Sequence, residues 1–289
     1  METIPVRHLN QTLKEPCFSG SFDILDLEVY LSGKDMVQEL HRHSFFYILV
    51  LEKGKGTHHI DFIPHPVQDD AVFIMRPGQV HELSLENGST GYLLKFSPDF
   101  YAPLSEADSQ VLRKVSSKDF YVLSRDTMEN VLFLLRNIYK ENKEKQESYM
   151  EAIRSYLAVF FIKLLRQSQE AAVSANHSSD YMQERLEAFQ ELIITSAAQF
   201  KQVSHYAEQL NLSTYQLNAI TKARLNKTCS ELINDNLLLE AKRYLLATSN
   251  QVNQIAWHLG YEDVSYFVRF FKKHTGYSPE AFRKTFIKP

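Results

Sequence analysis

The sequence predicts a two-domain α+β protein, with an N-terminal β-barrel, a helical segment after it, and a C-terminal domain made only of helices. Three observations predict this fold class. Short apolar runs separated by turn residues fill the N-terminal third, apolar residues at helical spacing follow, and one helix-turn-helix pattern occurs twice near the C-terminus. A chain of 289 residues is long enough for two domains with separate cores.

The expected domain boundaries come from one segment of small and polar residues. Residues 167–179 show no hydrophobic periodicity and have little to bury, which is typical of a linker. We therefore expect a first domain in residues 1–167, a linker in 168–183 and a second domain in 184–289.

Short strands are predicted for the first domain, and two helices after them. The apolar runs cover residues 24–31, 45–51, 71–75 and 92–96, with turns between them, which is typical of a β-sandwich or barrel. One helical stripe consists of Met128, Val131, Leu135 and Ile138, and the next of Met150, Ile153, Leu157, Phe160 and Leu164. Such stripes pack on the barrel or pair with a second protomer, and we expect a homodimer interface in residues 127–167.

The composition indicates a soluble protein of the cytoplasm. Hydrophobic residues make up 44% and charged residues 23% of the chain, and nowhere do about 20 apolar residues follow one another as a membrane span requires. The N-terminus lacks the apolar core of a signal peptide, and Cys17 and Cys229 lie too far apart to suggest a disulfide framework. We expect no membrane partner.

The net charge of −3 is unevenly distributed. Residues 184–289 hold 13 Lys and Arg against 10 Asp and Glu, a balance of +3, and the remaining 19 against 25 give −6 in residues 1–183. Local basic clusters attract phosphate, although an ordinary solvated helix face has the same composition.

The repeated pattern spans residues 203–212 and 252–261. Ala207 and Ala256 are the small residues that allow close helix packing, and four residues later Asn211 and Gly260 tolerate the left-handed conformation of a tight turn. A second amphipathic helix follows each copy. This is the helix-turn-helix pattern, in which the second helix enters a DNA groove.

Outward positions of the two second helices are the candidate DNA contacts. Ser213 is predicted to cap the first of them, with Leu217 and Ile220 inward. In the second, Phe267, Phe270 and Phe271 are predicted to be buried. The candidate DNA-contacting residues are Tyr215, Asn218 and Lys222, with Thr221 on the same side, and then Val264, Ser265, Arg269, Lys272 and Lys273.

A single long helix is predicted in residues 229–248, between the two units. A rigid spacer of this length can present two helices to successive major grooves, which recur after about 34 Å on one face of B-DNA. A helical protein-interaction domain is the alternative for the whole segment.

The last 40 residues resemble the signature of AraC/XylS-type transcriptional regulators. The matching residues are Ile255-Ala256-x2-Leu259-Gly260-Tyr261, Ser265-Tyr266-Phe267-x-Arg269-x-Phe271-Lys272-Lys273 and Gly276-Tyr277-Ser278-Pro279-x2-Phe282-Arg283. The resemblance covers about residues 184–289. It implies binding of double-stranded promoter DNA, usually activation of transcription, and RNA polymerase as a partner. Departures are Ala219 and Leu237, where the family often has arginine, and Thr221, where it has an aromatic residue.

Residues 18–100 resemble the cupin motifs of sensor domains in the same regulator class. The matching residues are His41-x-His43, Gly54-x-Gly56 and Pro77-Gly78-x2-His81. Catalytic cupins bind a metal through such histidines and a glutamate, and Tyr47 stands at the glutamate position. We expect His41, His43, Tyr47 and His81 to line the pocket of a small-molecule effector, with no metal, no cofactor and no enzymatic activity.

Two alternatives are left open for this domain. Three histidines without the acid still offer a facial metal site, so that the chain would be a metal-dependent cupin enzyme fused to a DNA-binding module. Otherwise the barrel only dimerises. His58 and His59 are adjacent on a predicted strand and face opposite sides, so they are not expected to chelate together.

Overall fold

The computed structural model describes residues 6–7, 21–101, 106–170 and 180–286. The chain divides into two compact units, one within residues 5–174 and the other within residues 175–289. Among the described residues, the helices are all too short or too polar to span a bilayer.

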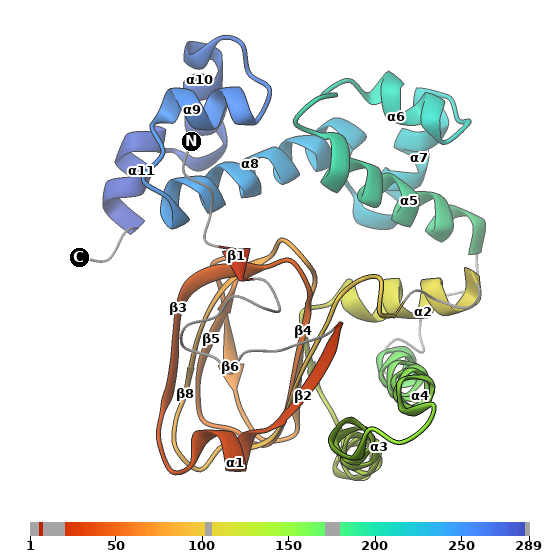
Figure 1. The fold of residues 1–289 in the computed structure, drawn as a ribbon. Coiled ribbons are helices and arrows are strands. Elements are labelled where there is room, and N and C mark those ends of the chain that lie inside the picture. Colours follow the sequence, from red (N-terminus) through yellow and green to blue (C-terminus); the bar gives the residue numbers. More distant parts are fainter. Residues whose placement is uncertain (1–5, 8–20, 102–105, 171–179, 287–289) are drawn as a thin grey trace. The chain divides into compact units, whose positions relative to one another are not determined.

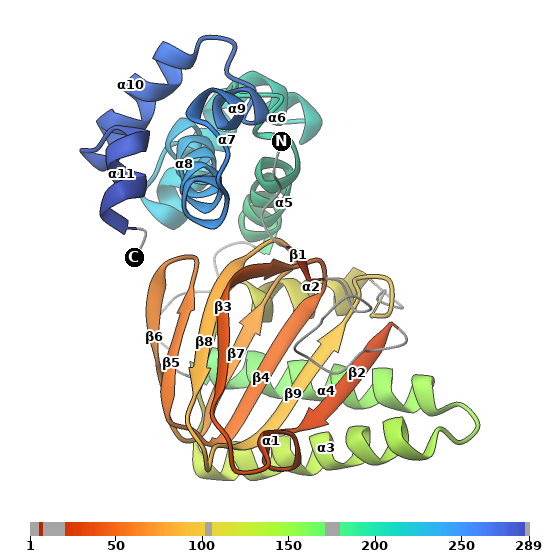
Figure 2. The same ribbon diagram turned by 60° about the vertical axis from the view of Figure 1, so that its left-hand side comes forward.

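The first unit contains two five-stranded sheets (Figure 2). In spatial order, the first sheet consists of β1 (Val6–Arg7), β3 (Met36–His43), β8 (Val80–Leu85), β5 (Gly56–Ile60) and β6 (Ile63–Val67). The second consists of β10 (Phe120–Val122), β7 (Ala71–Met75), β4 (Phe46–Lys53), β9 (Thr90–Phe96) and β2 (Phe22–Asp26). All pairings are antiparallel except β1 with β3. Within the described residues these pairings form two separate sheets, so the expected barrel has the form of a sandwich.

The second sheet is buried on both faces. Tyr47 and Leu49 point into the core between the two sheets, whereas Ile48 and Val50 point into a core shared with α3 (Arg125–Glu144) and α4 (Tyr149–Glu170). This explains why residues 45–51 are continuously apolar, since a strand covered on both sides has no polar face. Figure 2 shows α3 and α4 beside β2 and β9.

The two predicted helical stripes are buried against this sheet. Met128, Val131, Leu135 and Ile138 of α3 and Ile153, Leu157, Phe160 and Leu164 of α4 are each 0% exposed, and Met150 is partly buried. Packing within the subunit therefore uses both stripes. Phe133, with 62% of its surface exposed, and Val159, with 42%, lie outside them.

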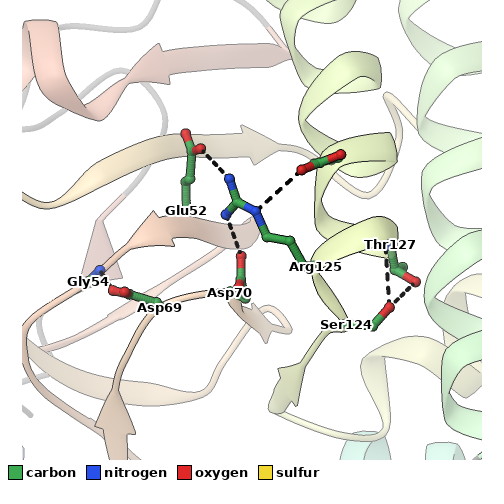
Figure 3. A network of polar contacts seen from close by, with 8 residues as sticks. Glu52, Gly54, Asp69, Asp70, Ser124, Arg125 and Thr127 are labelled. Carbon is green, nitrogen blue, oxygen red and sulfur yellow. Dashed lines mark hydrogen bonds and ion pairs between the residues drawn. The ribbon is translucent and has the colours of Figure 1, made fainter.

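The start of α3 is fixed by its cap and by one arginine (Figure 3). Ser124 is the N-cap, and its hydroxyl accepts a hydrogen bond from the backbone N–H of Thr127. The guanidinium of Arg125 contacts Asp70 at 3.1 Å, Glu52 at 3.2 Å and Glu129 at 3.4 Å. Arg125 thereby joins the helix to β4 and to the turn before β7.

The prediction of one strand over residues 24–31 is wrong in its second half. The strand β2 ends at Asp26, and the helix α1 (Leu27–Leu31) begins there. The Asp26 carboxylate accepts hydrogen bonds from the backbone N–H groups of Glu28 and Val29, at 3.0 and 3.2 Å. An N-cap of this kind satisfies the free donors of a first helical turn, and it overrides the alternating pattern.

The second unit is entirely helical in its described residues. Its helices are α5 (Asp180–Ser196), α6 (Val203–Gln209), α7 (Thr214–Leu225), α8 (Cys229–Ala247), α9 (Val252–His258), α10 (Val264–Thr275) and α11 (Pro279–Phe286). Figure 1 shows α6 and α7 near one end of α8. The helices α9, α10 and α11 lie near its other end. The spacer helix predicted in residues 229–248 is thus present.

The predicted linker 168–183 is helical at both of its ends. The helix α4 extends to Glu170 and α5 begins at Asp180. The middle of the predicted linker, residues 171–179, lies outside the described residues.

Candidate functional site

The first helix-turn-helix unit is formed by α6 and α7. Asn211 has a φ of 53°, the left-handed conformation expected at this position, and the backbone N–H of Leu212 donates to the carbonyl of Ala207 at 2.8 Å. Ser213 caps α7 through a reciprocal pair of bonds with Gln216, one in each direction between side chain and backbone. The capping prediction for Ser213 is confirmed, and both ends of the turn are fixed by local chemistry.

The side chains that α7 offers to solvent differ from the predicted set at one position. Tyr215 is 82% exposed and Lys222 is also exposed, whereas Thr221 is fully buried. The Thr221 hydroxyl donates to the backbone carbonyl of Asn218 at 3.2 Å and lies 3.6 Å from the Cys229 sulfur. The outward placement of Thr221 is therefore wrong, because α8 packs against that side of α7.

Asn218 lies at the edge of the same contact and is half-buried. Its side-chain oxygen accepts the backbone N–H of Cys229 at 3.0 Å, and its amide nitrogen donates to the carbonyl of Thr214 at 2.9 Å. The Cys229 N–H belongs to the first turn of α8 and has no partner within that helix. Asn218 thus connects α7 to the start of α8, a role that helical periodicity did not indicate.

The second helix-turn-helix unit is formed by α9 and α10. Gly260 has a φ of 69°, and the backbone N–H of Tyr261 donates to the carbonyl of Ala256 at 2.9 Å, the same bond as in the first unit. Asp263 caps α10 by accepting the backbone N–H of Ser265 at 2.7 Å. The two copies of the sequence repeat therefore fold into two copies of one turn.

Four of the five candidates on α10 are exposed. Ser265, Arg269, Lys272 and Lys273 are exposed, and Val264 is half-buried. On the opposite face of α10, Phe267 and Phe271 are fully buried.

Phe270, which was predicted to be buried, is only half-buried. Its ring centroid lies 5.6 Å from that of Tyr261 and 4.8 Å from that of His274. The helix period places Phe270 at the boundary of the core.

Arg269 is held loosely. Its guanidinium lies 3.7 Å from the Asp263 carboxylate, and the side chains are 69% and 62% exposed. An exposed pair of this kind contributes little to stability, so Arg269 can exchange Asp263 for another acceptor at small cost.

Lys201 was not predicted from the sequence. It joins the two helix-turn-helix units within the helical part of the chain. Its ammonium donates to the carbonyl oxygens of Gly260 at 2.7 Å and Ala198 at 3.1 Å, and it lies 4.6 Å from the centre of the Tyr261 ring. Burial lowers the pKa of Lys201. The segment before α6 is thereby attached to the turn between α9 and α10.

The spacer α8 lies between the two helix-turn-helix units. Its 19 residues correspond to a length of about 28 Å at about 1.5 Å per residue. This helix length is somewhat shorter than the repeat of about 34 Å between major grooves on one face of B-DNA. The end of α8 is bound to α11 by Arg283, which donates to the carbonyls of Leu245 and Asn250 at 2.9 and 2.5 Å.

In the β-sandwich, the Nε2 atoms of His41, His43 and His81 meet at one point. The Nε2 atoms of His41 and His43 are 3.1 Å apart, those of His43 and His81 are 2.8 Å apart, and those of His41 and His81 are 3.1 Å apart. Each side chain is at most 2% exposed. His41 and His43 share one face of β3 because they are two residues apart, and His81 faces His41 across the β3–β8 pairing.

Hydrogen bonds behind the rings fix their orientation. His41 Nδ1 donates to the backbone carbonyl of Glu39 at 2.6 Å, and since a carbonyl only accepts, this nitrogen carries the hydrogen. His81 Nδ1 lies 2.9 Å from Nε2 of His58, which is fully buried. Burial, with smaller contributions from neighbouring histidines, lowers the pKa of His58 to about 3, so its ring is neutral at neutral pH.

His58 and His59 face opposite sides of β5, as predicted. His59 lies on the outer face and contacts Glu82 at 3.1 Å. The alternation predicted this orientation but not the contact of His58 with His81.

Tyr47 and Lys95 face the cluster from the other sheet. The Tyr47 ring stacks on His43 with centroids 5.0 Å apart and an angle of 5°. Lys95, paired with Tyr47 across β4 and β9, is 1% exposed, and its ammonium lies 5.8 Å from the Tyr47 ring centre. Tyr47 thus places an aromatic ring where an acid would supply a carboxylate, and Lys95 was missed because it lies within an apolar run.

Two family models match the chain. Residues 27–158 match the AraC-like ligand binding domain, and residues 206–285 match a helix-turn-helix domain. The HTH-type transcriptional activator RhaR of Mannheimia succiniciproducens is 23% identical over 253 residues, which are 86% of this chain and 88% of that protein. The activator RhaS of an Enterobacter species is 24% identical over 84% of this chain and 87% of its own length. Fatty acid-bound ToxT of Vibrio cholerae, a solved structure, is 14% identical over 94% of this chain and 99% of its own, with a TM-score of 0.42.

Proposed function

Because the chain belongs to the AraC family of transcription regulators, we propose that it activates transcription from promoter sites bound by its two helix-turn-helix units. The observation that carries this proposal is the paired turn geometry, with α7 and α10 exposing polar faces at the two ends of one rigid helix. Activation requires contact with RNA polymerase, and the chain acts in the cytoplasm, where promoter DNA is found.

We assign the DNA contacts to the exposed side chains of α7 and α10, together with the half-buried Asn218 and Val264 beside them. The assigned residues are Tyr215, Asn218, Lys222, Val264, Ser265, Arg269, Lys272 and Lys273. Arg269 is assigned to a base edge, because its fork of donors matches the two acceptors of guanine and it lies in the middle of the exposed face. Lys272 and Lys273, near the end of α10, are assigned to phosphates, which fix the register without reading sequence.

The N-terminal unit, within residues 5–174, is assigned a sensing role. The relatives are regulators rather than enzymes, and residues 27–158 match a ligand-binding domain. A small-molecule effector would occupy the polar region lined by His41, His43, Tyr47 and His81. It would act by binding more tightly to one of the arrangements in which the protein binds DNA.

A homodimer is proposed through the helices of the first unit. Phe133 of α3 is 62% exposed although it is a large apolar residue on a helix whose other stripe is already buried. We propose that this side chain packs against a second copy of the chain.

Selection of DNA sites from a random pool by the full-length protein tests the main proposal. We expect enrichment of a bipartite site whose halves are about one helical turn apart, protected on one face in a footprinting experiment. Enrichment of a single half-site that Arg269→Ala leaves unchanged would contradict the assignment of both units to DNA. Sedimentation of Phe133→Glu against the unchanged protein tests the dimer separately.

A further inference from the structure

The strongest feature outside the DNA-binding surface is the meeting of three imidazole nitrogens in the β-sandwich. We propose that His41, His43 and His81 bind one divalent transition-metal ion through their Nε2 atoms, contrary to the expectation of no metal drawn from the sequence. The three residues provide ligand atoms that all lie within 4.8 Å of one another, and all three side chains are buried. This inference concerns the sandwich alone and goes beyond the proposed function.

The distances between the nitrogens fit coordination. A metal bound to imidazole lies about 2.1 Å from each nitrogen, so two ligands at right angles stand about 3.0 Å apart and two at the tetrahedral angle about 3.4 Å apart. The three separations are 3.1, 2.8 and 3.1 Å. They match three ligands on one face of an octahedron, which leaves other positions for water or an oxygen-bearing ligand.

The tautomers required for metal binding are supported from behind. His41 Nδ1 carries its hydrogen because it donates to the Glu39 carbonyl, so the Nε2 of neutral His41 presents a lone pair to the cluster. His58 Nε2, 2.9 Å from His81 Nδ1, serves as the acceptor that directs the His81 lone pair inward. Metal-binding histidines usually donate their second ring N–H to such an outer partner, which fixes the ring and raises its basicity.

The donor set selects the class of ion. Neutral imidazole suits zinc, nickel, iron and copper, whereas calcium and magnesium prefer oxygen ligands. The Tyr47 ring stacked on His43 covers the cluster from the opposite sheet. We therefore expect a first-row transition metal and not an alkaline-earth ion.

Metal titration of the full-length protein, made without a polyhistidine tag and stripped with chelator, tests the proposal. We expect about one cobalt or zinc ion per chain by elemental analysis, visible d–d absorption of the cobalt form, and no competition from excess magnesium. His81→Ala and His41→Ala should abolish this binding. The matched control is His59→Ala on the outer face of β5, which should bind the metal as the unchanged protein does.

The role of His58 gives a second readout. His58→Ala should lower metal affinity by about 10- to 100-fold while keeping the cobalt spectrum, because the three ligands remain. His58→Gln keeps an acceptor for His81 and should recover part of that loss. X-ray absorption of the zinc-loaded unchanged protein does not depend on whether any variant folds, and it should report three imidazole ligands. A stoichiometry below about one ion per ten chains, a spectrum with one imidazole or none, or equal loss in His59→Ala would overturn the proposal.

Discussion

Gly260 lies against the carbonyl oxygen of Ala198, so that a β-carbon at Gly260 would overlap this oxygen. The contact joins the turn between α9 and α10 to the chain segment that precedes α6. The Lys201 ammonium bonds to the carbonyl oxygens of both residues. The turn between α9 and α10 therefore helps to fix the position of the first helix-turn-helix unit relative to the second.

Gly260→Ala should destabilise the helical unit strongly. The φ of 69° costs alanine about 1–2 kcal/mol, and the overlap with Ala198 adds a further 1–3 kcal/mol or so because backbone must move. Trp257 is the only tryptophan of the chain and belongs to this unit, so its fluorescence in urea reports the unfolding.

The matched control for this prediction is Gly276→Ala. Gly276 has a φ of 79°, and among the described residues, its two chain neighbours aside, no atom lies within 4 Å of the position of its β-carbon. Only the backbone conformation is therefore tested there. Equal losses in the two variants would show that the Ala198 contact contributes nothing.

Asn218→Ala should weaken the joint between α7 and α8. The substitution leaves the backbone N–H of Cys229 without its acceptor at the start of α8, a loss of about 0.5–1.5 kcal/mol for an ordinary hydrogen bond. Asn218→Asp keeps the accepting oxygen and should retain most of the stability in the same urea titration. If both variants unfold at the urea concentration of the unchanged protein, the bond has no energetic role.

Local signals predicted much of the helical unit. Asn211 and Gly260 were expected at left-handed positions, and their φ values are 53° and 69°. Ser213 was expected to cap α7 and does. These features depend on a few neighbouring residues, and sequence contains that information directly.

Contacts between distant segments were not predictable in the same way. Thr221 was expected to face outward, but it is buried because α8 covers it. The angle at which two helices pack cannot be deduced from the residue pattern of either helix alone. In the sandwich, alternation separated His58 from His59, yet it did not indicate that His58 reaches His81 on the neighbouring strand. Register between strands decides such contacts.

Arg125→Gln should lower the thermal midpoint of the sandwich unit at low salt only. Arg125 has three acidic partners but is 54% exposed, so the attraction acts through solvent and is screened. At about 1 M salt the screening length is about 3 Å, and the variant should unfold with the unchanged protein. Calorimetry of both proteins at two salt concentrations measures this. Lys140→Gln is the control, since the Lys140 ammonium lies 4.0 Å from the Glu144 carboxylate, at the limit of an ion pair, and the thermal midpoint of this variant should hardly move.

Arg269→Ala should weaken binding to the selected DNA site and relax its sequence preference. An arginine bonded to a guanine contributes about 1–3 kcal/mol of discrimination, which is about 5- to 150-fold in affinity. Because Arg269 is exposed and only loosely paired with Asp263, its loss should leave the urea midpoint of the helical unit nearly unchanged. Lys273→Ala provides the contrast, because a phosphate contact should weaken all sequences alike and reduce the salt dependence of binding by about one ion. Gel-shift titrations with the selected site and a scrambled site at several salt concentrations separate the two roles. An Arg269→Ala protein that loses affinity equally for both DNAs would assign Arg269 to a phosphate and not to a base.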